Sequence, residues 1–159
     1  TSRTTDVYID RQGRHNFLLE NIDEANMMVS IHINSHSVKA YKGTMVLFYN
    51  KPNEKEDYGI TSKELALLVK DNLVNDLGLQ DRGVVSRNDQ WILEQNNEGK
   101  ISAYEGEERP VTNLPTILCE LCFISNDEEF ERLTTEEFQD TAANAIYNGI
   151  IAAKEQMQK

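Results

Sequence analysis

The stretch TILCELCFISN, residues 116–126, decides the fold because it has the composition of a strand buried on both faces. Seven of its eleven residues are apolar or cysteine, as in the interior strands of α/β sheets. Glu120 lies in the middle of this run. An isolated ionised carboxylate in an apolar interior is costly, so Glu120 must be protonated, paired or next to a metal. The other interpretation is that the strand ends at the sheet edge, where Glu120 meets solvent or an arginine. The stretch alone leaves both open.

The elements around this strand alternate between helical and strand periodicity. Helical spacing predicts helices over residues 14–25 and 61–77, and period two predicts strands over MVSIHIN and TMVLFYN, residues 28–34 and 44–50. Residues 52–59 are predicted as a loop, and QWILEQ and ISAYE, residues 90–95 and 101–105, as strands. Capping boxes predict helix starts at three pairs: Thr61 with Glu64, Ser125 with Glu128, and Thr134 with Glu137. Strands that alternate with amphipathic helices indicate an α/β sheet covered by helices.

Length, charge and cysteine content narrow the class of protein. The 159 residues, 39% hydrophobic and 27% charged, suit one globular domain. Lysine and arginine total 16 against 27 acidic residues, and the resulting net charge of −11 argues against a nucleic-acid partner. No run approaches the roughly 20 apolar residues of a membrane span. With only two cysteines, no disulfide framework is predicted.

His32 and the two cysteines are candidate metal or redox residues. His32 lies on the polar side of a predicted strand, where a surface or satisfied core histidine is the ordinary interpretation. His36 is four residues away, about 13 Å along an extended chain, too far to share a metal with it. Cys119 and Cys122 are predicted to point to opposite faces of a strand and to act as small buried hydrophobic residues.

Several segments together resemble a known family. SIHIN (residues 30–34), DRGV (81–84), ELCFISN (120–126) and AANAIYNGI (142–150) occur in the order and spacing of zinc-dependent N-acetylmuramoyl-L-alanine amidases of the amidase-3 type. The resemblance spans nearly the whole chain. It implies a twisted, mostly parallel sheet flanked by helices on both faces, one zinc ion, and hydrolysis of the amide between N-acetylmuramic acid and L-alanine in peptidoglycan.

The resemblance also assigns roles to two residues. His32 matches a zinc-binding histidine of the family, and Glu120 matches its catalytic glutamate. Glu120 would then take a proton from a water molecule that zinc activates for attack on the substrate carbonyl. Asn34 and Arg82 match recurrent positions of the family without an assigned role. Action outside the cytoplasm is implied, at the cell wall, as a secreted protein or in phage lysis.

One part of the family pattern is missing. Two of the family's zinc ligands, a histidine in a glycine-rich turn and a glutamate on the following helix, precede the segment that TSRTTD, residues 1–6, matches. The resemblance therefore predicts that residues 1–159 form a single but N-terminally incomplete catalytic domain. A complementary segment of roughly 30 residues would supply the two further ligands that a catalytic zinc requires.

Two alternative functions follow from the same features. The first is a non-catalytic relative that keeps the fold and binds peptidoglycan or regulates its turnover. The second is another zinc peptidase built on a similar sheet. Products distinguish them, since an amidase releases peptides that begin with L-alanine whereas a peptidase cleaves inside the stem peptide.

Overall fold

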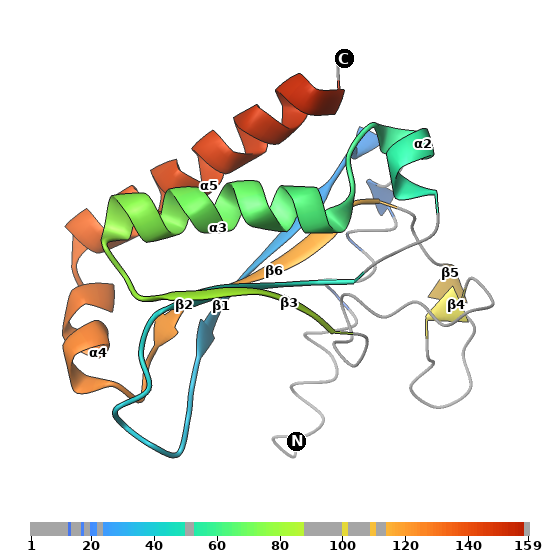
Figure 1. Cartoon of the computed structure of the whole chain (residues 1–159). Helices are drawn as coiled ribbons and strands as arrows, with labels where there is room; N and C mark the ends of the chain where they lie inside the picture. The colour runs from blue at the N-terminus through green and yellow to red at the C-terminus, as the bar shows by residue number, and fades with distance from the viewer. Residues whose placement is uncertain are drawn as a thin grey trace.

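Four strands form the main sheet of the protein (Figure 1). The computed structural model describes residues 24–49, 53–87 and 114–157, the single residues 13, 17, 20 and 21, and the backbone of two short strands. The strand order is β1 (Met28–Asn34), β6 (Thr116–Phe123), β2 (Thr44–Phe48) and β3 (Asp81–Ser86). β1 runs parallel to β6 and β2 parallel to β3, while β2 and β6 are antiparallel. The predicted α/β class with a mostly parallel sheet is confirmed.

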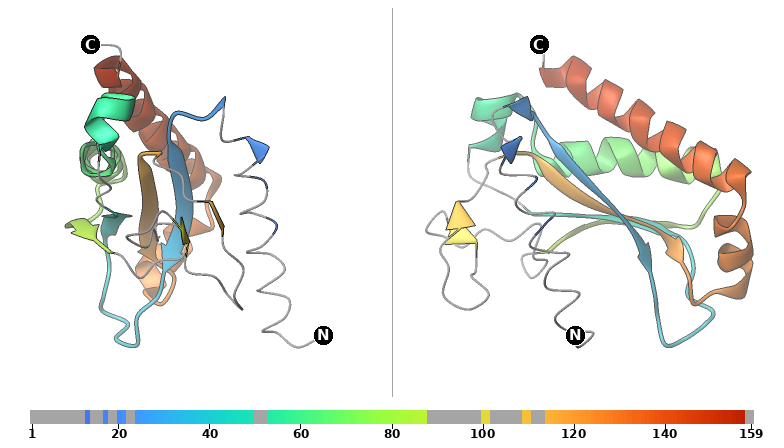
Figure 2. Two further views of the ribbon diagram at one scale, coloured as in Figure 1. Left: turned by 90° about the vertical axis from the view of Figure 1, so that its right-hand side faces the viewer. Right: turned by 180° about the vertical axis from the view of Figure 1, so that it is seen from behind.

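Two long helices lie on the same side of this sheet (Figures 1 and 2). They are α3 (Ser62–Leu77) and α5 (Glu136–Met157). Shorter elements complete the described fold: α2 (Glu54–Tyr58), α4 (Asp127–Leu133), and an antiparallel pair of β4 (Lys100–Ile101) and β5 (Arg109–Pro110). The helix predicted over residues 14–25 and the strands predicted over 90–95 and 101–105 lie largely outside the described residues.

The main hydrophobic core lies between the sheet and these two helices. The apolar stripe of α3 packs on the inner residues of β2 and β6, and α5 packs on α3: the core includes Leu65, Val69, Leu73, Leu77, Val46, Phe48, Ile117, Phe138, Ala142, Ala145 and Ile146. Each buried aliphatic or aromatic side chain contributes about 1.5–3 kcal/mol. The helices approach closely at Gly149, where an added Cβ would lie 2.7 Å from the Cα of Val69.

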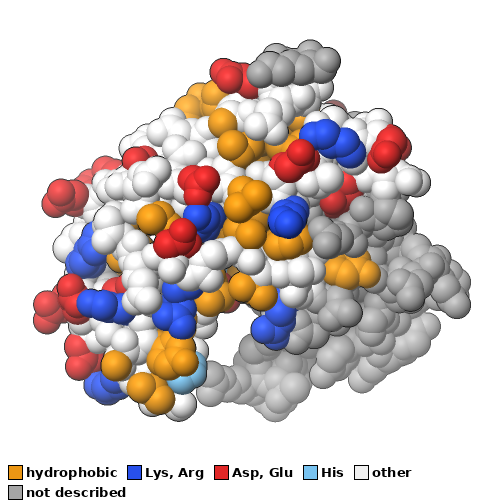
Figure 3. Space-filling view, viewed as in Figure 1, with side chains coloured by type: hydrophobic (Ala, Val, Ile, Leu, Met, Phe, Trp, Pro, Cys, Tyr) orange, Lys and Arg blue, Asp and Glu red, His pale blue; other side chains and the backbone are white. Residues whose placement is uncertain are grey.

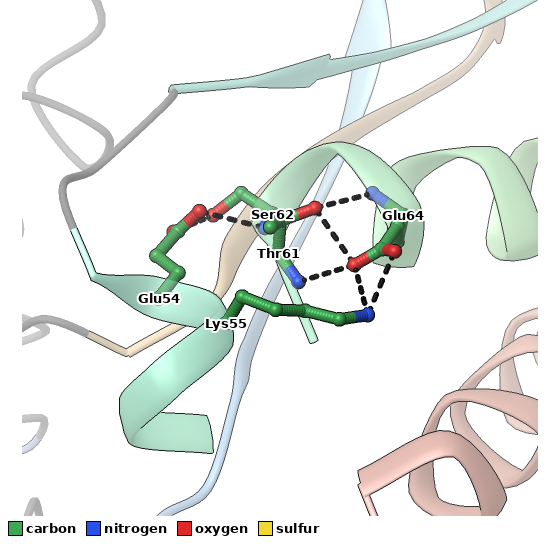
Figure 4. Close-up of polar contacts among 5 residues, drawn as sticks. All are labelled: Glu54, Lys55, Thr61, Ser62 and Glu64. Atoms are coloured by element: carbon green, nitrogen blue, oxygen red, sulfur yellow. Dashed lines mark hydrogen bonds and ion pairs between the residues drawn. The ribbon is translucent and has the colours of Figure 1, made fainter. Parts of the chain in front are cut away.

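Side-chain caps fix the helix ends. Thr61 caps α3: its side chain accepts from the backbone N–H of Glu64, and the Glu64 carboxylate accepts from the backbone N–H of Thr61, as predicted (Figure 4). Lys55 lies 2.8 Å from the same carboxylate. The other two predicted caps are each wrong by one residue, because Asn126 caps α4 and Thr135 accepts from the first turn of α5.

The segment predicted as a loop over residues 52–59 contains the short helix α2. Its first residue, Glu54, is buried and accepts hydrogen bonds from both the backbone N–H and the hydroxyl of Ser62 (Figure 4). The hydroxyl oxygen of Ser62 in turn accepts from the backbone N–H of Thr116, 2.9 Å away. These tertiary bonds join α2, α3 and the start of β6, and the local sequence does not reveal them.

The orientation of the two cysteines differs from the prediction. Both thiols lie in the same hydrophobic core rather than on opposite faces. The cause is a register shift between β1 and β6: His32 is opposite Glu120, but Asn34 is opposite Phe123. β6 thus has one residue more than β1 in this interval, which interrupts its alternation. Both thiols are buried, as predicted, and burial raises the pKa of each to about 12, which keeps them in the neutral form.

Candidate active site

The structure brings the two predicted site residues together. His32 in β1 and Glu120 in β6 are direct partners in the register of two adjacent parallel strands. Residues that are opposite each other in neighbouring strands project to the same face of a sheet. This face is opposite the main core, because the neighbours Ile117 and Cys119 in β6 belong to that core.

The Glu120 carboxylate is half-buried and incompletely paired. Its Oε2 atom is buried and has no hydrogen-bond partner among the described residues. Burial raises the pKa of the Glu120 carboxyl group above its ordinary value. The backbone at this point is fixed, since the carbonyl oxygen of Glu120 accepts from the Thr44 hydroxyl at 3.1 Å. A carboxyl group with a raised pKa and a free oxygen is suited to exchanging protons with a substrate or a water molecule.

We name the surface around these residues the site face and define it by His32, Asn34, Met45, Glu120 and Phe123. Asn34 follows His32 by two residues in β1 and therefore points the same way. Its amide nitrogen lies 3.9 Å from the sulfur of Met45, which is opposite Glu120 in β2. Phe123 is opposite Asn34. A small apolar cluster of Leu47 and Leu118 continues this face.

A second carboxylate, Glu129, holds the edge of the site face together. Its side chain is buried; Oε1 accepts from the backbone N–H of Gly43 at 2.6 Å and Oε2 from that of Phe123 at 2.7 Å. Gly43 has φ +110°, and a Cβ there would lie 2.3 Å from the carbonyl oxygen of Gln80, so only glycine fits. Glu129 thereby fixes the end of β6 against the start of β2. Glu129 was not predicted as a structural residue; its spacing from Asn126, typical of a helix start, was the available signal in the sequence.

The remaining loop after β1 is also anchored to the end of β6. The backbone N–H of His36 donates to the Ser125 hydroxyl at 3.0 Å, and the Asn126 amide donates to the carbonyl of Lys39 at 2.8 Å. His36 lies in this loop beyond the strand, its ring stacked on Tyr41. It is not part of the site face.

Metal-binding capacity on the described residues is limited. His32 offers one imidazole and Glu120 one carboxylate, and in the described ranges no group of three histidine, cysteine or acidic residues is placed to hold an ion. A catalytic zinc normally has three protein ligands. His32 is suited to be one protein ligand of a zinc ion, and Glu120 is suited to be a base beside it. A complete zinc site needs further protein ligands.

The surface of the described residues carries mixed charges. On the side shown in Figure 3, lysine and arginine side chains lie beside aspartate and glutamate side chains at several places. Lys39 with Asp127 and Lys42 with Glu128 form exposed ion pairs, both at 3.0 Å. Among the helices that the structure describes, none is long and apolar enough to cross a membrane.

The fold and the site face together define a class: an α/β protein in which a histidine and a half-buried glutamate are opposite each other in two adjacent parallel strands of the sheet. Residues 1–152 match the N-acetylmuramoyl-L-alanine amidase family, and the chain belongs to that family. The resemblance inferred from the sequence is therefore confirmed.

Relatives of known sequence or structure agree with this assignment. The uncharacterised protein YqiI of Bacillus subtilis (strain 168) is 31% identical over 150 residues, which cover 94% of this chain and 60% of YqiI. The N-acetylmuramoyl-L-alanine amidase LytC of the same organism is 26% identical over 95% of this chain and 26% of LytC. The CwlD amidase of Clostridioides difficile, solved in complex with the GerS lipoprotein, superposes with a TM-score of 0.70 at 29% identity, over 97% of this chain and 66% of CwlD. The chain thus spans less than two thirds of these relatives' length.

Proposed function

We propose that this chain is part of a zinc-dependent amidase that hydrolyses the bond between N-acetylmuramic acid and L-alanine in peptidoglycan. The observation that carries the proposal is the pairing of His32 with Glu120 across β1 and β6, with a buried Glu120 oxygen that has no hydrogen-bond donor among the described residues. Membership of the amidase family supplies the substrate. The site of action is the cell wall, outside the cytoplasm or during phage lysis.

In this proposal, His32 is a metal ligand through one imidazole nitrogen and Glu120 is the general base and acid. When bound, zinc supplies a Lewis acid that polarises the amide carbonyl and makes a water molecule more acidic. Glu120 accepts the proton of the attacking water at Oε2 and later delivers it to the amine of L-alanine as that group leaves. The raised pKa of the Glu120 carboxyl group favours both steps, because a base must also be able to return its proton near neutral pH.

The remaining ligands lie, in this proposal, outside the described residues. The ligand count on the site face covers only those residues.

Peptidoglycan digestion by the full-length protein tests the proposal. Hydrolysis exposes the amino group of L-alanine, which amine labelling and identification of the N-terminal residue detect. We expect activity that EDTA removes and zinc restores. His32→Ala should abolish it, whereas the control Tyr147→Ala, at a 60% exposed position of α5, should retain it. Activity that survives both EDTA and His32→Ala contradicts the proposal.

The limited ligand set on the described residues favours a second candidate, a non-catalytic relative that binds peptidoglycan. This candidate predicts that the full-length protein sediments with purified peptidoglycan and releases no L-alanine amino groups at any zinc concentration. The same digestion assay, combined with a sedimentation assay, separates the two functions.

A further inference from the structure

Arg82 differs from the other cations around the site face because it has no acidic partner among the residues that the structure describes. In a chain with 27 acidic and 16 basic residues, acidic partners are abundant. Lys39, Lys42 and Lys70 each bind a carboxylate within 3.0 Å. Arg82, which is half-buried at the start of β3, binds no carboxylate among the described residues, and its Nη1 donates only to the carbonyl oxygen of Lys42 at 3.1 Å.

Aromatic rings hold the Arg82 guanidinium in place. It lies 4.6 Å from the ring centroid of Tyr41 and 5.5 Å from that of Phe123. The Tyr41 ring is in turn stacked on His36, with centroids 3.8 Å apart. Cation–π contacts of this kind orient a guanidinium without using its N–H groups. One of its five N–H groups donates to the carbonyl oxygen of Lys42. The other N–H groups of the oriented, planar guanidinium have no acceptor among the described residues and can bind one from a ligand.

The guanidinium lies beside the site face. Phe123, which it covers, is a member of that face and is three residues from Glu120 in β6. β2 and β3 run antiparallel to β6, so the start of β3 and the end of β6 meet at the same edge of the sheet. Arg82 is thus positioned where a substrate bound at Glu120 would extend past the edge of the sheet.

The acidic side chains close to Arg82 among the described residues already bind lysines or backbone N–H groups. Asp81, its neighbour in sequence, accepts from Lys70 at 2.7 Å and from the backbone of Gly83 at 2.7 Å. Asp127 and Glu128 pair with lysines of the loop after β1, and Glu129 accepts from two backbone amides. An anion that binds Arg82 therefore has to come from outside this part of the protein.

We propose that Arg82 is a specificity-determining residue that binds a carboxylate of the peptide part of the substrate, so that the site selects acidic peptides. This inference rests on the proposed amidase function. The oriented guanidinium forms two parallel charge-assisted hydrogen bonds to the carboxylate oxygens, an arrangement that an amide cannot reproduce. Tyr41, 39% exposed, forms one side of the subsite.

Binding of two matched ligands tests this subsite. One ligand is a soluble N-acetylmuramoyl dipeptide with free carboxylates, and the other is the same compound with every carboxylate converted to an amide. Calorimetry with the full-length protein, carrying Glu120→Gln to prevent turnover, gives the ratio of the two dissociation constants. With Arg82 present we expect the carboxylate form to bind at least about tenfold more tightly.

Arg82→Gln should reduce this ratio to about twofold or less, and Arg82→Lys, which keeps the charge but loses the planar fork, should give an intermediate value. The control Lys63→Gln, an exposed cation on α3 across the sheet, should leave the ratio unchanged. Circular dichroism checks folding; if Arg82→Gln does not fold, an unchanged ratio in Arg82→Lys overturns the inference.

A ratio near one with Arg82 present, or a tenfold ratio that persists in Arg82→Gln, overturns the subsite. If the protein without substitutions still hydrolyses peptidoglycan in a zinc-dependent way, the proposed function stands and only the subsite fails. If the ratio depends on Arg82 but no hydrolysis occurs, the subsite stands and the binding function replaces the amidase.

Discussion

Two carboxylates, one in β6 and one in α4, differ in whether the fold satisfies them. Glu129 is buried and accepts hydrogen bonds with both oxygens, and these join β6 to β2. Glu120, in the middle of β6, has a buried oxygen with no described partner and a raised pKa. A buried acceptor without a donor costs about 1–3 kcal/mol, so the fold gains nothing from Glu120 in this state. The comparison shows that Glu129 stabilises the fold, and it supports the proposal that Glu120 takes part in the reaction.

Replacing Glu120 should produce the largest effect on activity. Glu120→Gln is nearly isosteric but cannot accept the proton, and we expect hydrolysis of peptidoglycan to fall about 1,000-fold. The free energy of unfolding should not decrease. The control Glu131→Gln, at an exposed position of α4, should keep full activity. Release of L-alanine amino groups measures both, and comparable activity in the two variants would refute the assigned role of Glu120.

The same substitution at Glu129 should affect stability instead. In Glu129→Gln an amide NH₂ group replaces one acceptor oxygen and faces a backbone donor, so we expect a loss of about 3 kcal/mol in the free energy of unfolding. Urea denaturation measures it. Glu128→Gln removes only an exposed ion pair with Lys42 and should cost less than about 1 kcal/mol. Equal effects of these two variants would show that the Glu129 hydrogen bonds are not important for the fold.

A substitution on the core side of the sheet tests whether stability depends on packing there. Gly149→Ala places a methyl group 2.7 Å from the Cα of Val69, and we expect a loss of about 1–3 kcal/mol from the displaced helices. Asn148→Ala, one residue earlier and exposed, should change the stability by less than about 0.5 kcal/mol. Thermal unfolding of both variants checks this, and a neutral Gly149→Ala would show that α3 and α5 can separate without cost.

The smallest expected effect is the pH dependence caused by Glu120. Because its pKa is raised in the folded state, the folded protein binds the proton more tightly than the unfolded chain does. Stability therefore decreases as the pH rises from the ordinary glutamate pKa through the raised folded value. Glu120→Gln removes this term, so its stability relative to the unsubstituted protein should increase between acidic and neutral pH. Urea midpoints at both pH values measure the difference; a decrease would contradict the raised pKa.

Much of the fold was predictable because local periodicity determines it. The alternation in residues 28–34 and the apolar run from residue 116 gave β1 and β6, and the cap at Thr61 gave α3. β3 was missed because charged residues and Gly83 interrupt its apolar pattern, so the segment at residues 81–86 lacks the alternation of a strand. α2 was missed because its first residue is held by a tertiary bond to Ser62.

The candidate site was predictable only in part. The family resemblance singled out His32 and Glu120, and the pattern of the strands placed each of them within an element. Their adjacency depends on which strands pair and in which register, and periodicity along a single strand does not contain this information. The same holds for Arg82, whose contacts with Tyr41 and Phe123 join three segments that are far apart in the sequence.

Location of a bound zinc ion in crystals of the full-length protein tests the central claim most directly. An anomalous difference map at the zinc absorption edge should show a peak about 2.0–2.1 Å from an imidazole nitrogen of His32, on the site face and next to Glu120. A zinc ion bound elsewhere, or an imidazole of His32 directed away from Glu120, would contradict the account.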